Sequence, residues 1–245
     1  MSGHSKWANI KFRKEIADKR KGKIFTKLAR QITVASREGS EIKLRLAIEK
    51  AKQANLPSEN IERAIKKGRG ELEGIKLEDI TYEAIGPEKI AILISATTDN
   101  KNRTTSEIRN ILEKNGGKIS GAGSMKWLFG QKGLLRIALE GKNKEEIELA
   151  AIDAGAEDVQ EEKETILIYC RPENLEQIKK ELELRGIKII AAEISLEPKN
   201  TIKITESEKA KKILKLMDEL DNLDEVISVS ANFDIPDELM EKVEE

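Results

Sequence analysis

Residues of the types that perform catalysis are scarce in this chain of 245 residues, which has one histidine, His4, and one cysteine, Cys170. A single imidazole excludes metal motifs built on paired histidines and relays that need two imidazoles. The sequence has no Gly-x-x-x-x-Gly-Lys-Ser/Thr phosphate loop and no Gly-x-Ser-x-Gly elbow. Gly121-Ala-Gly123 begins like a dinucleotide fingerprint, but position 126 holds lysine where that motif needs glycine. We therefore predict no catalytic residue, no cofactor and no metal site.

Three other features have a functional and a structural interpretation, and the structural one is favoured in each. Cys170 ends an apolar stretch, so we predict a buried thiol rather than a nucleophile. The polar stretch Thr97–Thr104 precedes a predicted helix; it forms either a backbone anion site or a turn with a helix cap, the cap being Thr104 or Asn102. The acids at positions 157, 158, 161, 162 and 164 are predicted to solvate a hairpin rather than to bind a cation.

Basic charge is concentrated at the N-terminus and is the clearest functional signal. Residues 1–70 carry 19 Lys or Arg and 7 acids, a formal charge of +12, so the rest must carry −13 to give the chain's −1. Lysine and arginine neutralise nucleic-acid phosphates, and the indole of Trp7 can stack on a base. The predicted nucleic-acid contacts are Lys6, Trp7, Lys11, Arg13, Lys14, Lys19, Arg20, Lys21, Lys23, Lys27 and Arg30.

Alternatives remain for these residues. The cations could simply solvate helix faces, and Trp7 together with Phe12 could pin the arm to the helical domain. His4 lies in the same basic arm, where we expect an exposed or phosphate-contacting imidazole rather than a catalytic one. Charge predicts affinity for DNA or RNA without choosing between them, because both are polyphosphates.

The elements that carry this basic charge are predicted to be helices. Residues 1–21 are typical of an arm, with a short helix around residues 9–19. Apolar residues at helical spacing then predict helices over residues 23–38, 41–54 and 58–68, with Ser58 as a cap for the third. A linker with glycines at 68, 70 and 74 follows. We interpret residues 1–76 as a basic helical domain.

The periodicity changes to that of strands after residue 77. We expect strands at 80–85 and 90–97, a helix at 103–115 and a short strand at 125–129. Residues 132–199 show the order βαββαβ, which is the ferredoxin-like pattern. A strand, a helix and a strand follow, at 201–204, 207–220 and 226–233.

These elements predict a multidomain α and α+β protein, with a three-helix N-terminal domain and two ferredoxin-like-type α/β domains. One α/β domain, residues 77–131 plus 200–245, would be discontinuous, and residues 132–199 would be inserted in it. A linear arrangement of modules is the alternative.

Composition limits where the protein works. With one cysteine no intrachain disulfide can form, which favours a reducing compartment. No apolar run approaches the ~20 residues of a membrane helix. We expect a cytoplasmic protein with no membrane partner.

Short motifs spread over the whole chain resemble the YebC/PmpR family. They are Gly3-His-Ser-Lys-Trp-Ala-Asn-Ile-Lys, Gly22-Lys-Ile-Phe-Thr-Lys-Leu, Leu46-Ala-Ile-Glu-Lys-Ala-Lys, Asn60-Ile-Glu-Arg-Ala-Ile-Lys-Lys-Gly, Asp99-Asn-Lys-Asn-Arg-Thr and Asn232-Phe-Asp-Ile-Pro-Asp. The resemblance implies three domains and no enzymatic activity. Members are described as transcriptional regulators that bind DNA; mitochondrial relatives are translational activators, and bacterial members have been tied to the ribosome. The sequence departs from the family at Glu88 and Lys89, where a glycine pair is common, and in a shorter loop at residues 39–43.

The leading hypothesis is a non-enzymatic regulator of gene expression that binds DNA or RNA, with the acidic domains meeting protein partners. A second is a ribosome- or RNA-associated translation factor. Two alternatives come from other classes. One is a metal-dependent enzyme that uses the acidic domains. The other is an adaptor protein in which residues 1–70, the basic head, dock on an acidic protein.

Overall fold

The computed structural model describes Trp7 and residues 21–72, 77–139, 143–162, 165–236 and 238–240, with the backbone alone at 21–23. The chain groups into two compact units. Unit 1 is Met1–Ser40, Ala47–Phe129 and Glu197–Glu245, and unit 2 is Glu41–Leu46 and Gly130–Leu196. The predicted three-domain division is a different one and stays a prediction. The arm helix expected around residues 9–19 lies outside the described residues.

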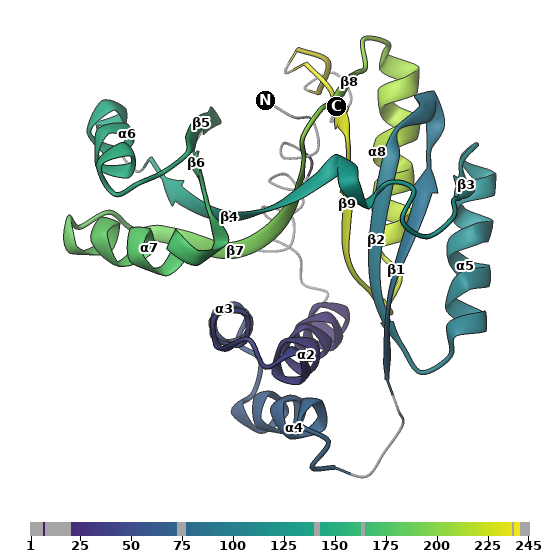
Figure 1. Ribbon diagram of the computed structural model, residues 1–245, viewed down its shortest axis with the longest axis horizontal. Coiled ribbons are helices and arrows are strands. Elements are labelled where there is room, and N and C mark those ends of the chain that lie inside the picture. Colours follow the sequence, from purple (N-terminus) through teal and green to yellow (C-terminus); the bar gives the residue numbers. More distant parts are fainter. Residues whose placement is uncertain are drawn as a thin grey trace. The chain divides into compact units, whose positions relative to one another are not determined.

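Three helices open the described part of the chain, as predicted: α2 (Lys21–Glu38), α3 (Glu41–Gln53) and α4 (Ser58–Gly68). Within unit 1, α2 packs against α4 (Figure 1). The predicted cap of α4 is wrong. Ser58 is the first helical residue, and Pro57 occupies the N-cap with φ −56° and no side-chain cap. Pro57 has ψ 140°, an extended backbone conformation, so the helix begins only at the next residue.

Unit 1 also contains a four-stranded sheet in the order β3-β1-β2-β9. Its strands are β1 (Glu78–Ile85), β2 (Ala91–Thr98), β3 (Lys118–Ile119) and β9 (Val226–Ala231). Figure 1 shows α5 (Lys101–Lys114) and α8 (Ser207–Asp221) beside this sheet. Apolar side chains of both helices, such as Ile108, Ile213 and Met217, are buried with those of β1, β2 and β9 in one core. Strand β9 therefore completes a sheet that begins more than a hundred residues earlier.

Unit 2 carries the second sheet, in the order β5-β6-β4-β7. The elements are β4 (Phe129–Ala138), α6 (Lys144–Asp153), β5 (Asp158–Glu162), β6 (Thr165–Cys170), α7 (Leu175–Leu184) and β7 (Ile189–Pro198). Both β4 and β5 pair with β6 in antiparallel register. This βαββαβ order with β6 between β5 and β4 is the predicted ferredoxin-like pattern. The predicted fold class, three helices followed by α/β sheets, is confirmed.

Several boundaries differ from the expectation. The strand expected at 125–129 is a 3₁₀ turn, η2 (Lys126–Leu128), and β4 starts at Phe129. Helix α5 is capped by Asn100, neither Asn102 nor Thr104; the Asn100 side chain accepts from Arg103 N. Two-residue strands β8 (Ile202–Lys203) and β10 (Phe233–Asp234) pair in parallel, so the predicted last strand is split between β9 and β10.

Candidate nucleic-acid interface

Two of the predicted phosphate contacts, Lys27 and Arg30, lie on α2 and are engaged inside unit 1. The Lys27 ammonium lies 3.1 Å from the Asp221 carboxylate and also donates to the Asp221 carbonyl. Arg30 donates to the carbonyls of Asp224 at 2.6 Å and Thr97 at 3.3 Å. The side chains of the Lys27–Asp221 pair are only 16% and 11% exposed. Such a partly buried pair holds α2 beside the end of α8, and we interpret both cations as positioning residues.

Trp7, predicted to stack on a base, is 4% exposed and packs in the core of unit 1. Its indole nitrogen donates to the Asp218 carboxylate at 2.9 Å. With its faces covered and its one donor used, the ring is not open to a base in this structure. Trp7 thus serves as an anchor, as in the alternative, but it is anchored in the core formed by the β3-β1-β2-β9 sheet and α8 and not, as expected, on the helical domain.

The other eight predicted contacts have side chains outside the described part of the structure. They are Lys6, Lys11, Arg13, Lys14, Lys19, Arg20, Lys21 and Lys23. Their assignment therefore stays a prediction.

A second group of cations, which the sequence-based prediction missed, lies on α4. Arg63, Lys66 and Lys67 are exposed and, among the described residues, form no ion pair. Positions 63, 66 and 67 are related by three and four residues, so they share one face of the helix. These three cations are part of the +12 of residues 1–70, but the predicted nucleic-acid contacts end at Arg30. Their helical spacing was the signal that could have found them.

Close contacts with α2 fix the end of α4 that carries these cations. A Cβ at Gly68 would lie 2.4 Å from the Thr33 carbonyl oxygen, so only glycine permits this approach. The hydroxyls of Thr33 and Ser36 donate to the carbonyls of Ala64 at 3.2 Å and Ile65 at 3.0 Å. The cationic face of α4 is thus held on a rigid support.

A third feature missed from the sequence is the loop of residues 120–127, which wraps a buried carboxylate. The Glu83 carboxylate, on β1, accepts from the backbone N–H groups of Gly123 at 2.6 Å, Lys126 at 3.1 Å and Met125. Burial alone would raise the pKa of Glu83, but these donors outweigh it and lower that pKa. Gly123 has φ +82°, so the glycines that resembled a nucleotide fingerprint serve this turn instead.

The same loop presents Trp127, which is 65% exposed. Its indole N–H donates to the Ser124 carbonyl at 2.9 Å. The ring is therefore fixed by a loop contact while most of its surface stays open to solvent. The stretch Gly121-Ala-Gly-Ser-Met-Lys-Trp127, a glycine-rich turn followed by Lys-Trp, is the sequence signal that could have indicated an exposed aromatic.

The polar stretch Thr97–Thr104 forms a turn with a helix cap, the interpretation favoured from the sequence. The Thr98 hydroxyl accepts from Asn100 N at 2.9 Å, and the Asn100 side chain accepts from Arg103 N at 3.0 Å. The Arg103 guanidinium pairs with Asp99 at 2.8 Å and Glu225 at 2.9 Å. Thr98, Asn100 and Arg103 are thus used in hydrogen bonds and ion pairs within the protein.

The groups that could support catalysis are few among the described residues. Cys170 is buried, as predicted, and burial raises the pKa of its thiol to about 11. A thiol of this kind is a poor nucleophile. In the described ranges, no three His, Cys, Asp or Glu residues gather where they could hold a metal ion. Glu157 and Glu161, from the acidic stretch, pair with Lys132 and Lys144 instead.

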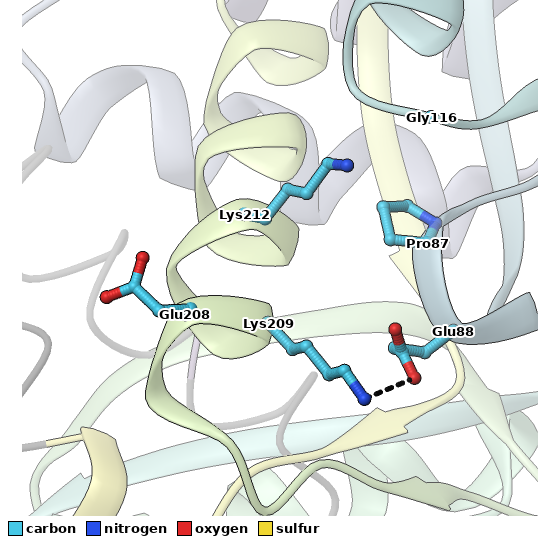
Figure 2. A pocket seen from close by; sticks show the side chains of 6 residues that line it. All are labelled: Pro87, Glu88, Gly116, Glu208, Lys209 and Lys212. Atoms are coloured by element: carbon cyan, nitrogen blue, oxygen red, sulfur yellow. Dashed lines mark ion pairs between the residues drawn. The ribbon is translucent and has the colours of Figure 1, made fainter.

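A pocket of about 380 Å³ lies in unit 1. Figure 2 shows the residues that line it, Pro87, Glu88, Gly116, Glu208, Lys209 and Lys212. Lys209 pairs with Glu88 at 3.2 Å across it, so opposite charges largely neutralise each other there. Glu88 and Lys89 have φ of +55° and +62°, which disfavours residues with a Cβ. These are the two positions where the sequence departs from the glycine pair of the family it resembles. The pocket brings no catalytic set together.

Two protein-family models match consecutive parts of the chain. A family model described as the TACO1/YebC protein N-terminal domain matches residues 5–71, and one described as the TACO1/YebC second and third domain matches residues 77–233. A protein of Halothermothrix orenii named "Probable transcriptional regulatory protein" is 47% identical, and the match covers all of both chains. A protein of Aquifex aeolicus with the same name is 46% identical over 99% of this chain and 100% of its own.

A solved structure shows the same fold. A crystal structure of a conserved hypothetical protein from Aquifex aeolicus matches with a TM-score of 0.82 and 46% identity, covering 90% of this chain and 93% of the other. Separately, none of the helices that the structure describes has the length and apolar character to cross a membrane.

Proposed function

This chain belongs to the TACO1/YebC family, and we propose that it regulates gene expression by binding nucleic acid, without catalysing a reaction. Relatives across the full length carry the name "Probable transcriptional regulatory protein", which supports transcription as the regulated step. Promoter DNA is then the proposed target, and RNA in the translation machinery is the alternative. The proposed site of action is the cytoplasm.

The observation that carries this proposal is the segregation of charge. Residues 1–70 have a formal charge of +12 on a chain whose total is −1. Part of this charge is on Arg63, Lys66 and Lys67, which are exposed and form no ion pair among the described residues. Exposed cations grouped on one helix face are suited to bind consecutive phosphates.

The proposed contacts combine the arm with α4. They are Lys6, Lys11, Arg13, Lys14, Lys19, Arg20, Lys21, Lys23, Arg63, Lys66 and Lys67. The basic head is held in unit 1 by Lys27, Arg30 and Trp7, which bind Asp221, the carbonyls of Thr97 and Asp224, and Asp218. Phosphate contacts of this kind provide affinity and register but no base specificity. The acidic remainder, with a formal charge of −13, is the proposed surface for protein partners.

A salt titration with charge-neutralised variants tests the proposal. The triple variant Arg63→Gln, Lys66→Gln, Lys67→Gln should bind duplex DNA more weakly, with a shallower dependence of log K on log salt. The slope should fall by roughly 0.9 for each phosphate that is no longer neutralised. The matched control is Arg109→Gln, Lys180→Gln, Lys211→Gln, which removes the same charge at exposed positions elsewhere. Equal effects of the two triples, or binding insensitive to salt, would overturn the proposal.

The target is identified by crosslinking the full chain to nucleic acid in cells and sequencing what is bound. Enrichment of promoter DNA supports a transcriptional regulator, whereas enrichment of ribosomal or messenger RNA supports the translational alternative. If the α4 triple variant captured the same molecules as efficiently as the wild-type protein, nucleic-acid binding through this face would be excluded.

A further inference from the structure

We propose that Trp127 is a stacking platform for one unpaired base of a single-stranded nucleic acid, a contact that rests on the proposed function and deepens it. The loop of residues 120–127 would then contact a base of an opened or single strand, while the cations of the basic head bind the phosphates. Base–aromatic stacking tolerates any base, because each base has a π face.

The loop is built to hold the indole in place. The Glu83 carboxylate is 5% exposed and accepts N–H donors from Gly123, Met125 and Lys126. Ser124 adds a hydrogen bond from its hydroxyl to the Gly121 carbonyl at 2.6 Å. A ring presented by a preorganised loop loses little conformational entropy on binding, which favours a contact by a single side chain.

The geometry of the indole favours stacking over other kinds of contact. Its only hydrogen-bond donor is used by the Ser124 carbonyl at 2.9 Å. Most of its surface is open to solvent, since the residue is 65% exposed. A ring without a free donor offers a partner its π faces, and burying an exposed indole against a base is favourable.

The charges around the loop suit a polyanion. Residues 118–131 contain two cations, Lys118 and Lys126, and no acid. Both are exposed and, among the described residues, form no ion pair. Lys199 is placed beside the loop by its N–H, which donates to the Leu128 carbonyl at 2.8 Å. On a remainder of the chain that carries −13 this is a locally basic surface, able to neutralise phosphates next to a stacked base.

The neighbours of Trp127 argue against a protein partner. Gly121, Ala122, Gly123, Ser124 and Lys126 are exposed and either small or polar, and the apolar neighbours Met125 and Leu128 are only partly exposed. Among the described residues of unit 1, Leu72 is the other large exposed apolar side chain, and it belongs to a segment after α4. A stable protein interface needs a contiguous apolar core around its aromatic anchor, which this loop does not provide.

Tryptophan fluorescence of the full chain tests the contact directly. The chain has two tryptophans, the buried Trp7 and the exposed Trp127, so the part of a change on binding that is lost in Trp127→Ala reports Trp127. Titration with single-stranded oligo(dT) and oligo(U) should quench the emission. Trp127→Ala should abolish the quenching and bind roughly 5- to 150-fold more weakly, the usual range for one stacked base. Its salt slope should match wild type, because the indole neutralises no phosphate.

Two further variants keep the test sharp. Trp127→Phe retains an aromatic face and should recover most of the affinity. Lys126→Gln should keep the quenching but lower the salt slope by roughly 0.7 on a single strand. Because both side chains are exposed, circular dichroism and thermal melting should show folded variants.

The possible failures are distinguishable. Oligonucleotide binding without quenching, and with equal affinity for Trp127→Ala, overturns this inference and leaves the proposed function standing. Absence of binding to both single strands and duplex DNA removes both. If Trp127→Ala binds every nucleic acid normally yet fails to complement a deletion strain, the indole belongs to a protein contact, and the inference is again overturned.

Discussion

Glu83 shows at the scale of one residue how a buried charge can organise a loop. Its carboxylate is taken out of water, which is costly unless hydrogen bonds replace the lost solvation. Three backbone N–H groups from residues 123–126 provide that replacement, and the pKa of Glu83 is lowered as a result. Neither the glycines nor the glutamate is informative alone; the hydrogen bonds join residues forty positions apart.

Replacing this carboxylate should destabilise the protein in a pH-dependent way. Glu83→Gln leaves backbone donors without their charged acceptor, so the free energy of unfolding at pH 7 should fall by about 1–3 kcal/mol. A lowered pKa in the folded state means that ionised Glu83 stabilises the fold above its ordinary pKa. That contribution disappears as the pH falls through the lowered value.

Urea unfolding of wild type and Glu83→Gln between pH 7 and pH 3 measures this effect. The difference should be largest at pH 7 and shrink below the ordinary carboxyl range. Glu78→Gln, on the exposed part of the same strand, is the control and should change stability by less than about 0.5 kcal/mol. A difference that stays constant with pH would mean that the charge of Glu83 is not what holds the loop.

Backbone conformation predicts a stabilising change at Lys89. Residues with a Cβ are strained at positive φ, and Lys89 has φ +62°. Lys89→Gly should therefore raise the free energy of unfolding by about 0.5–1 kcal/mol, after the entropy cost of a glycine. Glu88→Gly should gain less, since it also removes the ion pair with Lys209 at 3.2 Å. Thermal melting ranks the two variants, and a lower midpoint for Lys89→Gly would contradict the strain.

At the scale of elements, hydrophobic periodicity predicted most helices and strands because each buries one face on a core. The α6 prediction, residues 144–153, agrees with the structure at both ends. The failures are at places that local pattern does not determine. The apolar residues of 125–129 looked like a strand, yet their N–H groups bond a carboxylate from another strand and fold into a 3₁₀ turn. The cap of α5 was misplaced because Asn100, Asn102 and Thr104 are all good caps.

The packing of α4 on α2 provides an element-scale prediction. Gly68→Ala would place a Cβ 2.4 Å from the Thr33 carbonyl oxygen and 2.7 Å from the Ser36 Cβ, so the helices must separate. We expect a decrease of about 1–3 kcal/mol in the free energy of unfolding. Chemical denaturation measures it, and Gly121→Ala is the control, since nothing lies near its Cβ and, as at Gly68, its φ is outside the left-handed region. A Gly68→Ala protein as stable as wild type would show that this packing is not tight.

At the scale of the whole molecule, the sequence predicted that charge is segregated but not how each cation is used. The count separates a head of +12 from a remainder of −13. It cannot distinguish Lys27, which meets Asp221 almost two hundred positions later, from Lys66, which faces solvent. That distinction depends on tertiary structure, which brings distant residues together. The α4 cations have a helical spacing that the sequence shows, but that they remain exposed and without an ion pair among the described residues is known only from the structure, and the predicted nucleic-acid contacts of the arm stay a prediction.

The two classes of cation should separate experimentally. Lys27→Met removes one charge of a partly buried pair and leaves the Asp221 carboxylate without its ammonium, so the free energy of unfolding should fall by about 1–3 kcal/mol. At a temperature where the variant stays folded, its affinity for duplex DNA and its salt slope should match wild type. Lys66→Met, at an exposed position, should do the opposite and lower the slope by roughly 0.9 with little change in stability.

A double-mutant cycle with Asp221→Asn checks that the stability effect belongs to the pair. The interaction free energy between the Lys27 and Asp221 side chains that the cycle gives should be stabilising and clearly larger than the error of the denaturation measurement. If Lys27→Met instead lowered the salt slope as Lys66→Met does, the ammonium would be contacting phosphate. The head would then release its internal ion pairs on binding, and the acidic end of α8 would compete with nucleic acid for the same cation.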